Sequence, residues 1–460
     1  MNRKLFSLIP LLLCGTLQAE SVKDEYGLII DAQNTISLFS TEKDAAKFNS
    51  KIPQARNAIA SSSSAKWYIN SAETRRICVE WDYGDGGIKS VKKDDNKATI
   101  QAPPPGRCLE WADVPTERYG TAAVYQSNDN VLNKAVVVVQ PYIVSVTDST
   151  YSDAQFYSDI NQSGLAASLR SAGYDVILYR YLNTDAGVAF NAKGVKALMK
   201  KLEEMPNVTS TSVIGLSMGG VVARYALKEL ENGTGLHKVA GFVSFDAPHL
   251  GANLPSSITD NISRLLSKVD SSLCGLSSAC REARTKLRAV LSKMQTKTYN
   301  ELIIGSPSGS SDRYALLNKL SSLGHVNTVP TLAITNGTKN TSQGYPNQTL
   351  VTHYKLHRKW YNGGSKYFKV YTNPSMDNQS GGYANFYQVL SDLIKEQPHP
   401  ITPYVTSGQR HSFVSTQSAL AGSESNFTEV AAYPSSNEQH MTITYSKALK
   451  LRQWLDSNHF

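Results

Sequence analysis

Residues 213–220 read Val-Ile-Gly-Leu-Ser-Met-Gly-Gly, and they constrain the fold of this chain more than any other stretch. A short apolar run leads into the motif, and a helix-forming run, 221–230, follows it. A serine placed between a strand and a helix lies in a turn so tight that only small residues fit beside it, as Gly215 and Gly219 do. The pattern therefore predicts that Ser217 is held at the carboxyl end of a buried strand.

The same context predicts a chemical role for Ser217. At a helix N-terminus, the helix dipole and the backbone N–H of Met218 can stabilise a negatively charged oxygen. A serine hydroxyl becomes a strong nucleophile only when a histidine takes its proton and a carboxylate supports that histidine. The sequence therefore predicts a Ser-His-acid triad, with a buried turn serine as the purely structural alternative.

The run from Ser217 to Tyr225, Ser-Met-Gly-Gly-Val-Val-Ala-Arg-Tyr, resembles the elbow of α/β-hydrolase lipases and esterases. The resemblance extends over residues 134–460. It implies hydrolysis of carboxylic esters, with lipids as the expected substrates, without a cofactor or a metal. In that fold the triad follows the chain order serine, acid, histidine.

Apolar periodicity supports the fold that the resemblance implies. Buried strands and amphipathic helices alternate along the chain, which is typical of an α/β protein with a doubly wound, mostly parallel sheet. The strands are expected at 136–139, 176–179, 211–214, 242–245 and 331–335, and the helices at 165–172, 195–202, 221–230 and 448–455.

The chain divides into three predicted parts. Residues 1–19 combine Arg3-Lys4 with a short apolar run, which is typical of a signal peptide and predicts export to the periplasm, the medium or the cell surface. Residues 20–130 contain short strand-like runs and predict a small β-rich domain. Residues 131–460 form the hydrolase domain, with a helical, lid-like insert at about 253–325.

Two histidines are candidates for the base. His440 is favoured because it follows Asn-Glu-Gln and is expected to precede directly a last strand and helix. His411 lies in His-Ser-Phe-Val-Ser-Thr-Gln-Ser, which resembles a stretch of bacterial lipases in which an aspartate stands at this position. The acid must then come from elsewhere in the chain.

Two aspartates compete for the role of acid. Asp246 follows the strand after the elbow, where pancreatic-type lipases carry theirs. Asp377 lies in a glycine-rich loop further along the chain. A capping role in the Pro-His-Leu-Gly turn is the structural alternative for Asp246.

The oxyanion hole needs a second N–H donor besides Met218. It is expected from the loop after 136–139, where Pro141 has no N–H and Tyr142 is the candidate.

Charge and cysteine content bound the remaining classes. The formal net charge is +9, and the lysines are scattered along the chain. The sequence has no basic stripe with interleaved aromatic residues, so nucleic-acid binding is not predicted. The protein is expected to contact a lipid–water interface.

Cysteine content predicts disulfides. Cys14 lies in the signal peptide, which leaves an even number of cysteines in an exported chain. Their proximity in sequence favours two disulfides, Cys78–Cys108 and Cys274–Cys280.

The sequence therefore predicts an exported serine hydrolase of carboxylic esters. The same triad also serves amidases and acyltransferases, so these remain alternatives. A third alternative is a hydrolase fold that only binds surfaces and does no chemistry.

Overall fold

The computed structural model describes the 460-residue chain in segments, and all structural statements concern these residues. They are 21–23, 29–31, 65–70, 76–81, 107–109, 119–129, 131–143, 153–254, 257–269, 278–305, 310–339, 350–356, 366–371, 379–384, 401–405 and 412–458.

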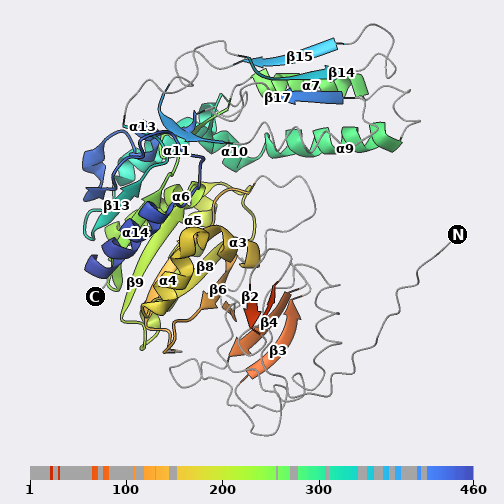
Figure 1. The fold of residues 1–460 in the computed structure, drawn as a ribbon. Helices are drawn as coiled ribbons and strands as arrows, with labels where there is room; N and C mark the ends of the chain where they lie inside the picture. The colour runs from red at the N-terminus through yellow and green to blue at the C-terminus, as the bar shows by residue number, and fades with distance from the viewer. Residues whose placement is uncertain are drawn as a thin grey trace, which may run out of the picture.

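A central eight-stranded sheet organises the fold (Figure 1). From edge to edge its strands are β19 (Glu429–Val430), β13 (Thr331–Ile334), β10 (Val239–Phe245), β9 (Ser210–Leu216), β7 (Lys134–Val139), β8 (Asp175–Tyr181), β6 (Gly120–Tyr125) and β5 (Arg107–Leu109). The first six run parallel, and β6 and β5 add an antiparallel edge. The predicted α/β class with a mostly parallel, doubly wound sheet is confirmed.

Helices cover both faces of the sheet because its strands are apolar on both sides. Successive strand residues point to opposite faces, so Val137 and Val139 join one hydrophobic cluster and Val136 and Val138 join the other. The first cluster includes residues of α5 (Val188–Glu204), α6 (Met218–Asn232) and α11 (Ser310–Leu323). The second includes residues of α3 (Asp153–Ile160), α4 (Leu165–Ser171) and α14 (Tyr445–Asn458).

A cap lies at one end of the central sheet (Figure 1). It contains α7 (Ser257–Val269), α9 (Ser278–Lys293), α10 (Lys297–Leu302) and an antiparallel sheet of β15 (Lys366–Tyr371), β14 (Leu350–Leu356) and β17 (Ile401–Val405). Its own apolar core joins Ile258 and Ile262 of α7 to Leu287 of α9 and to Tyr354 and Val370 of the sheet. The cap thus folds around a core separate from those of the central sheet.

The predicted helical insert at 253–325 differs from this cap in two ways. Leu316 and Leu320 of α11 pack in the same core cluster as α6, so the last part of that stretch belongs to the central layers. The cap also contains the sheet of β14, β15 and β17, which was not predicted as part of it. The prediction of helices in this insert rested on local pattern, which does not show against which surface a helix packs.

The predicted boundary at residue 131 also needs correction. β6 pairs antiparallel with β8 along its whole length, and β5 pairs with β6. Residues 107–109 and 120–125 are therefore strands of the central sheet. The expected strand after His440 is absent from the described chain as well, because β19 precedes this histidine and only α14 follows it.

Shorter elements complete the description. They are β1 (Ser21–Lys23), β2 (Ile29–Asp31), β3 (Ala65–Asn70), β4 (Arg76–Trp81), β11 (Ala252–Asn253), β12 (Ile303–Ile304), β16 (Gly381–Tyr383), β18 (Ser412–Ser415), α13 (Thr416–Ala419), and the 3₁₀ turns η1 (Gln162–Gly164) and η4 (Glu424–Asn426). β1 pairs with β2 and β3 pairs with β4, both antiparallel. In the described ranges, no helix is both long and apolar enough to cross a membrane.

Several predictions concern parts of the chain beyond these ranges. The signal peptide at 1–19 and Cys274 lie outside the described residues, and the side chains of Cys78, Cys108 and Cys280 are not described either. Export and both disulfides therefore stay predictions.

Candidate active site

Ser217 occupies the turn between β9 and α6 in a strained backbone conformation. Its φ is 51° and its ψ is −122°, a region that residues with a side chain seldom adopt. The Ser217 N–H donates to the Phe245 carbonyl at 2.9 Å, and the Gly220 N–H donates to the Ser217 carbonyl at 2.9 Å. Strain of this kind costs about 1–3 kcal/mol and persists only where surrounding contacts impose it. The strand–turn–helix predicted from the sequence is present here.

Three glycines around the serine are required by close approach. A Cβ on Gly215 would lie 2.4 Å from the Gly220 Cα, and one on Gly219 would lie 2.3 Å from the Val139 carbonyl oxygen. Both distances are shorter than any tolerable non-bonded contact, so a larger residue would force the turn apart. The second contact also shows that the end of β7 passes directly beside the elbow.

His440 lies between Ser217 and Asp246. Its Nε2 is 2.7 Å from the Ser217 Oγ, and its Nδ1 is 2.7 Å from the Asp246 Oδ2. The His440 side chain is only 11% exposed, and the Phe413 ring packs edge-on against its imidazole, with the two ring centroids 5.1 Å apart. The structure therefore joins three of the residues singled out from the sequence into one hydrogen-bonded chain.

Asp246 directly follows β10 and is fully buried. Its φ is 44°, and its N–H donates to the Ile334 carbonyl at 2.7 Å. Its carboxylate is so close to Gly382 that a Cβ there would lie 2.2 Å from Oδ2. Asp377 and His411, the competing acid and base, both lie outside the described residues.

A comparison with protein families agrees with this geometry. A family model described as "Putative serine esterase (DUF676)" matches residues 179–298, which contain Ser217 and Asp246 but not His440. This match covers less than half of the chain, so the fold is decided by the parallel sheet and the strained serine turn after β9. The chain has an α/β-hydrolase fold. A search of curated proteins found no match.

Solved structures similar to this chain include esterases. Naproxen esterase (carboxylesterase NP) from Bacillus subtilis is 11% identical, with a TM-score of 0.33, over 77% of this chain and 92% of that one. Est1E from Butyrivibrio proteoclasticus is 9% identical, with a TM-score of 0.26, over 50% of this chain and 76% of that one. The esterase EaEST from Exiguobacterium antarcticum is 14% identical, with a TM-score of 0.26, over 50% of this chain and 80% of that one. These TM-scores are too low to assign the fold, which is instead evident from the topology of the chain itself.

A cavity of about 530 Å³ opens beside Ser217 and His440. Its walls are mostly apolar and come from both the central layers and the cap: they include Ile143, Leu216, Leu302, Ile303, Phe413 and Met441. Ile303 of β12 packs in the apolar core of the cap, so the cap supplies part of the wall directly, whereas Leu302 at the end of α10 packs in the same cluster as α6. Among the described residues, no three His, Cys, Asp or Glu side chains gather as metal ligands would.

The two candidate oxyanion donors both line this cavity. Met218 is the first residue of α6, so its N–H has no partner within the helix. In the loop after β7, the Gln140 N–H already donates to the Tyr179 carbonyl at 3.0 Å. The backbone N–H of Tyr142 stays the candidate for the second donor.

The Tyr142 phenol fixes this loop to the base of the cap. It donates to Asp185 at 2.8 Å, and Asp185 also binds Lys293 of α9 at 2.5 Å. Burial, followed by the charge of Asp185, raises the pKa of Tyr142 well above its usual range. The phenol therefore stays protonated and keeps donating to Asp185.

Three residues of this site, Phe413, Gly382 and Asn336, were not predicted from the sequence. Nothing in the local sequence of Phe413 or Gly382 indicates a role, because only the folded chain brings them to His440 and Asp246. The position of Asn336 did offer an indication, since it follows the predicted strand 331–335. Polar residues just after parallel strands gather at one edge of the sheet.

Two further histidines lie close to Arg224. His249 is buried, and its Nε2 is 2.8 Å from the Ser244 Oγ. Burial, and then the nearby Arg224 and His325, lower its pKa well below 6.5. The half-buried His325 has a pKa lowered to about 4 by burial and by the positive charges of Arg224 and Lys228. Both imidazoles are therefore neutral at neutral pH.

We expect His325→Gln to make folding less sensitive to acid. An unfolded histidine titrates near pH 6.5, so between about pH 6.5 and 4 the unfolded chain binds a proton that the native His325 does not. Stability is therefore full above this window and is lost as the pH falls through it. Thermal unfolding at about pH 7 and pH 5 should show a smaller fall in Tm for the variant than for the wild type.

His237→Gln is the matched control, because that imidazole is 63% exposed. An identical fall in Tm for His325→Gln and the wild type would contradict the assignment of a neutral, half-buried imidazole at 325.

Proposed function

We propose that the chain is a serine hydrolase that cleaves carboxylic esters. One observation carries the proposal: two hydrogen bonds of 2.7 Å join Ser217, His440 and Asp246 in the order that nucleophilic catalysis requires. The "Putative serine esterase" family model over residues 179–298 supports the same reaction class.

In the first half of the proposed reaction, the Ser217 Oγ attacks the ester carbonyl while His440 Nε2 takes its proton. Asp246 stabilises the imidazolium that forms. The negative oxygen of the tetrahedral intermediate accepts hydrogen bonds from the backbone N–H groups of Met218 and Tyr142. The intermediate then collapses to an acyl-serine, and the alcohol leaves with the proton held by His440.

Water completes the cycle in the second half. His440 takes a proton from a water molecule that attacks the acyl-serine, and the carboxylic acid and the free Ser217 hydroxyl are released. The residues supply every proton transfer, so no cofactor enters the proposal. An amidase follows the same steps on an amide, with an amine leaving in place of the alcohol, and an acyltransferase uses a second alcohol in place of water. Both remain the alternatives.

The substrate that we propose is an ester with an apolar acyl chain, such as a lipid at a lipid–water interface. Support comes from the cavity walls, where Ile143, Leu302 and Phe413 surround the nucleophile with apolar surface. Burial of each methylene in such a cavity contributes about 0.8 kcal/mol. We further propose that residues 1–19 direct export, which would place the enzyme where external lipids are found.

A non-catalytic, surface-binding role is the second candidate. The strained serine turn and the hydrogen-bonded histidine argue against it, because backbone strain without a function is a net loss of stability.

We expect Ser217→Ala to abolish covalent labelling by a fluorophosphonate probe and to lower kcat for ester hydrolysis by roughly 10⁴-fold or more. The physical reason is that the variant lacks the nucleophile while the rest of the site is unchanged. Thermal unfolding serves as the control, since a folded variant is needed to interpret the loss. Labelling that persists in Ser217→Ala would refute the proposed nucleophile, and a wild-type protein that is not labelled would favour the surface-binding role.

We expect kcat/KM for p-nitrophenyl esters to rise with acyl length until the cavity is filled, by at most about fourfold per methylene. The Ile303→Trp variant should have a narrower cavity. Its kcat/KM for long-chain esters should fall, while it keeps much of its turnover of the acetate ester. A matched surface variant, Leu449→Trp, changes a side chain that is 44% exposed on α14 and should keep the wild-type profile. A flat wild-type profile would contradict the apolar-acyl proposal but leave esterase activity intact.

A further inference from the structure

Asn336 lies at the carboxyl end of the strand beside the one that carries Asp246. It follows β13 by two residues and is completely buried. Its backbone N–H donates to the Asp246 Oδ1 at 3.0 Å, while the other carboxylate oxygen contacts His440. Asn336 therefore fixes the orientation of the proposed catalytic acid from the side opposite the histidine.

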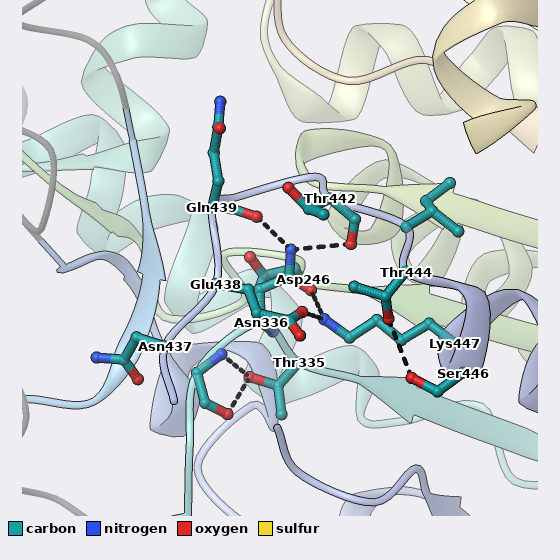
Figure 2. A network of polar contacts seen from close by, with 12 residues as sticks. Asp246, Thr335, Asn336, Asn437, Glu438, Gln439, Thr442, Thr444, Ser446 and Lys447 are labelled. Atoms are coloured by element: carbon teal, nitrogen blue, oxygen red, sulfur yellow. Dashed lines mark hydrogen bonds and ion pairs between the residues drawn. The ribbon is translucent and has the colours of Figure 1, made fainter. Parts of the chain in front are cut away.

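The side chain of Asn336 binds the turn that carries His440 (Figure 2). Its Nδ2 donates to the Gln439 carbonyl at 2.5 Å and to the Thr442 carbonyl at 3.3 Å. These carbonyls belong to the two ends of a four-residue turn, 439–442, which the Thr442 N–H closes onto the Gln439 carbonyl at 3.0 Å. One amide group thus spans the turn from end to end.

This turn needs an external restraint because its backbone is strained. Met441, the residue after His440, has a φ of 70°, which is unfavourable for a residue with a long side chain. The His440 N–H donates to the Tyr383 carbonyl at 2.7 Å, which holds one side of the turn. Asn336 holds the other side, where Asp246 lies.

Lys447 determines which way the Asn336 amide points. Its ammonium group is buried on α14, donates to the Asn336 Oδ1 and forms an ion pair with Glu438 (Figure 2). An ammonium group can only donate and the two turn carbonyls can only accept, so Oδ1 must face Lys447 and Nδ2 must face the turn. The Glu438 N–H also donates to the Asn336 carbonyl at 2.8 Å, which engages the remaining polar group of this residue.

We propose that Asn336 is a positioning residue that clamps the His440 turn onto Asp246, with Lys447 fixing the orientation of its amide. The inference rests on the proposed catalytic roles of His440 and Asp246. Because a single side chain and its own N–H restrain both partners, a small displacement at Asn336 changes the distance and the angle between acid and base together.

Asn336→Asp tests the clamp with minimal change of shape. The carboxylate still accepts from Lys447, and the backbone N–H to Asp246 remains. The two bonds to Gln439 and Thr442 are lost, however, because an ionised carboxylate has no N–H to donate and would face two carbonyl oxygens. The variant therefore removes the donor function of the amide and retains its acceptor function.

We expect Asn336→Asp to lower kcat by roughly 100-fold while KM changes by less than about threefold, because a displacement of about 1 Å in the catalytic groups costs this much without altering the substrate cavity. The rate of fluorophosphonate labelling should fall by the same factor. The control is Thr331→Val at the other end of β13, which removes a buried hydroxyl that accepts from the Thr428 N–H at 2.9 Å. It should lower Tm and leave kcat unchanged.

The outcomes separate the clamp from the proposed function. Wild-type protein labelled at Ser217 together with undiminished kcat in Asn336→Asp would overturn the clamp alone. Absence of labelling in the wild type would overturn the proposed function, and the catalytic positioning with it. If Asn336→Asp does not fold, Lys447→Met is the second variant: it keeps Asn336 but frees its amide to rotate. A kcat below that of the wild type with an unchanged KM supports the clamp, and an unchanged kcat refutes it.

Discussion

A serine held at positive φ between β9 and α6 is the constraint on which the rest of the site depends. The turn holds the Ser217 hydroxyl 2.7 Å from His440 Nε2, and it leaves the first N–H groups of α6 without partners in the helix. It can form only where the chain on either side is small, which is why Gly215, Gly219 and Gly220 surround it. The turn also depends on its neighbour β10, because the Phe245 carbonyl accepts the Ser217 N–H.

Parallel pairing then brings the other groups to this turn. β10 pairs with β9 so that Phe245 lies opposite Leu216, and the next residues along the two strands are Asp246 and Ser217. Phe245 has Ile334 of β13 as its other neighbour, which places Asn336 behind Asp246. The register of three adjacent strands therefore determines the positions of the residues that we propose as nucleophile, acid and clamp. Only His440 comes from a loop, and that loop requires fixation by hydrogen bonds.

The sequence predicted those parts of the fold that depend on local pattern. Continuous apolar runs predicted β7, β8, β9 and β10, and the small residues around Ser217 predicted the elbow. Parts that depend on distant pairing were missed. β6 joins the sheet through β8, more than 50 residues later in sequence, and β14 packs on cap helices that precede it. Neither pairing leaves a periodic signal that differs from that of any short strand.

In the candidate site, too, the residues with a local sequence pattern were predicted and those that depend on distant contacts were not. Ser217 and Met218 follow from the elbow itself, whereas the competition between Asp246 and Asp377 could not be resolved without the register of β10. The clamp was missed because Asn336 contacts 439–442, about 100 residues further along the chain. The positive φ of Met441 could not be predicted, since nothing in its local sequence favours such a turn.

The proposed triad depends on the 2.7 Å contact through which Asp246 Oδ2 supports His440 Nδ1. The most direct test is the kcat of Asp246→Asn, with Asp377→Asn as the matched control and Tm measured for both. Loss of the acid in a serine triad typically lowers kcat by about 10⁴-fold, so we expect that loss for Asp246→Asn and near wild-type turnover for Asp377→Asn. A larger loss for Asp377→Asn, with Asp246→Asn changing only Tm, would contradict the account.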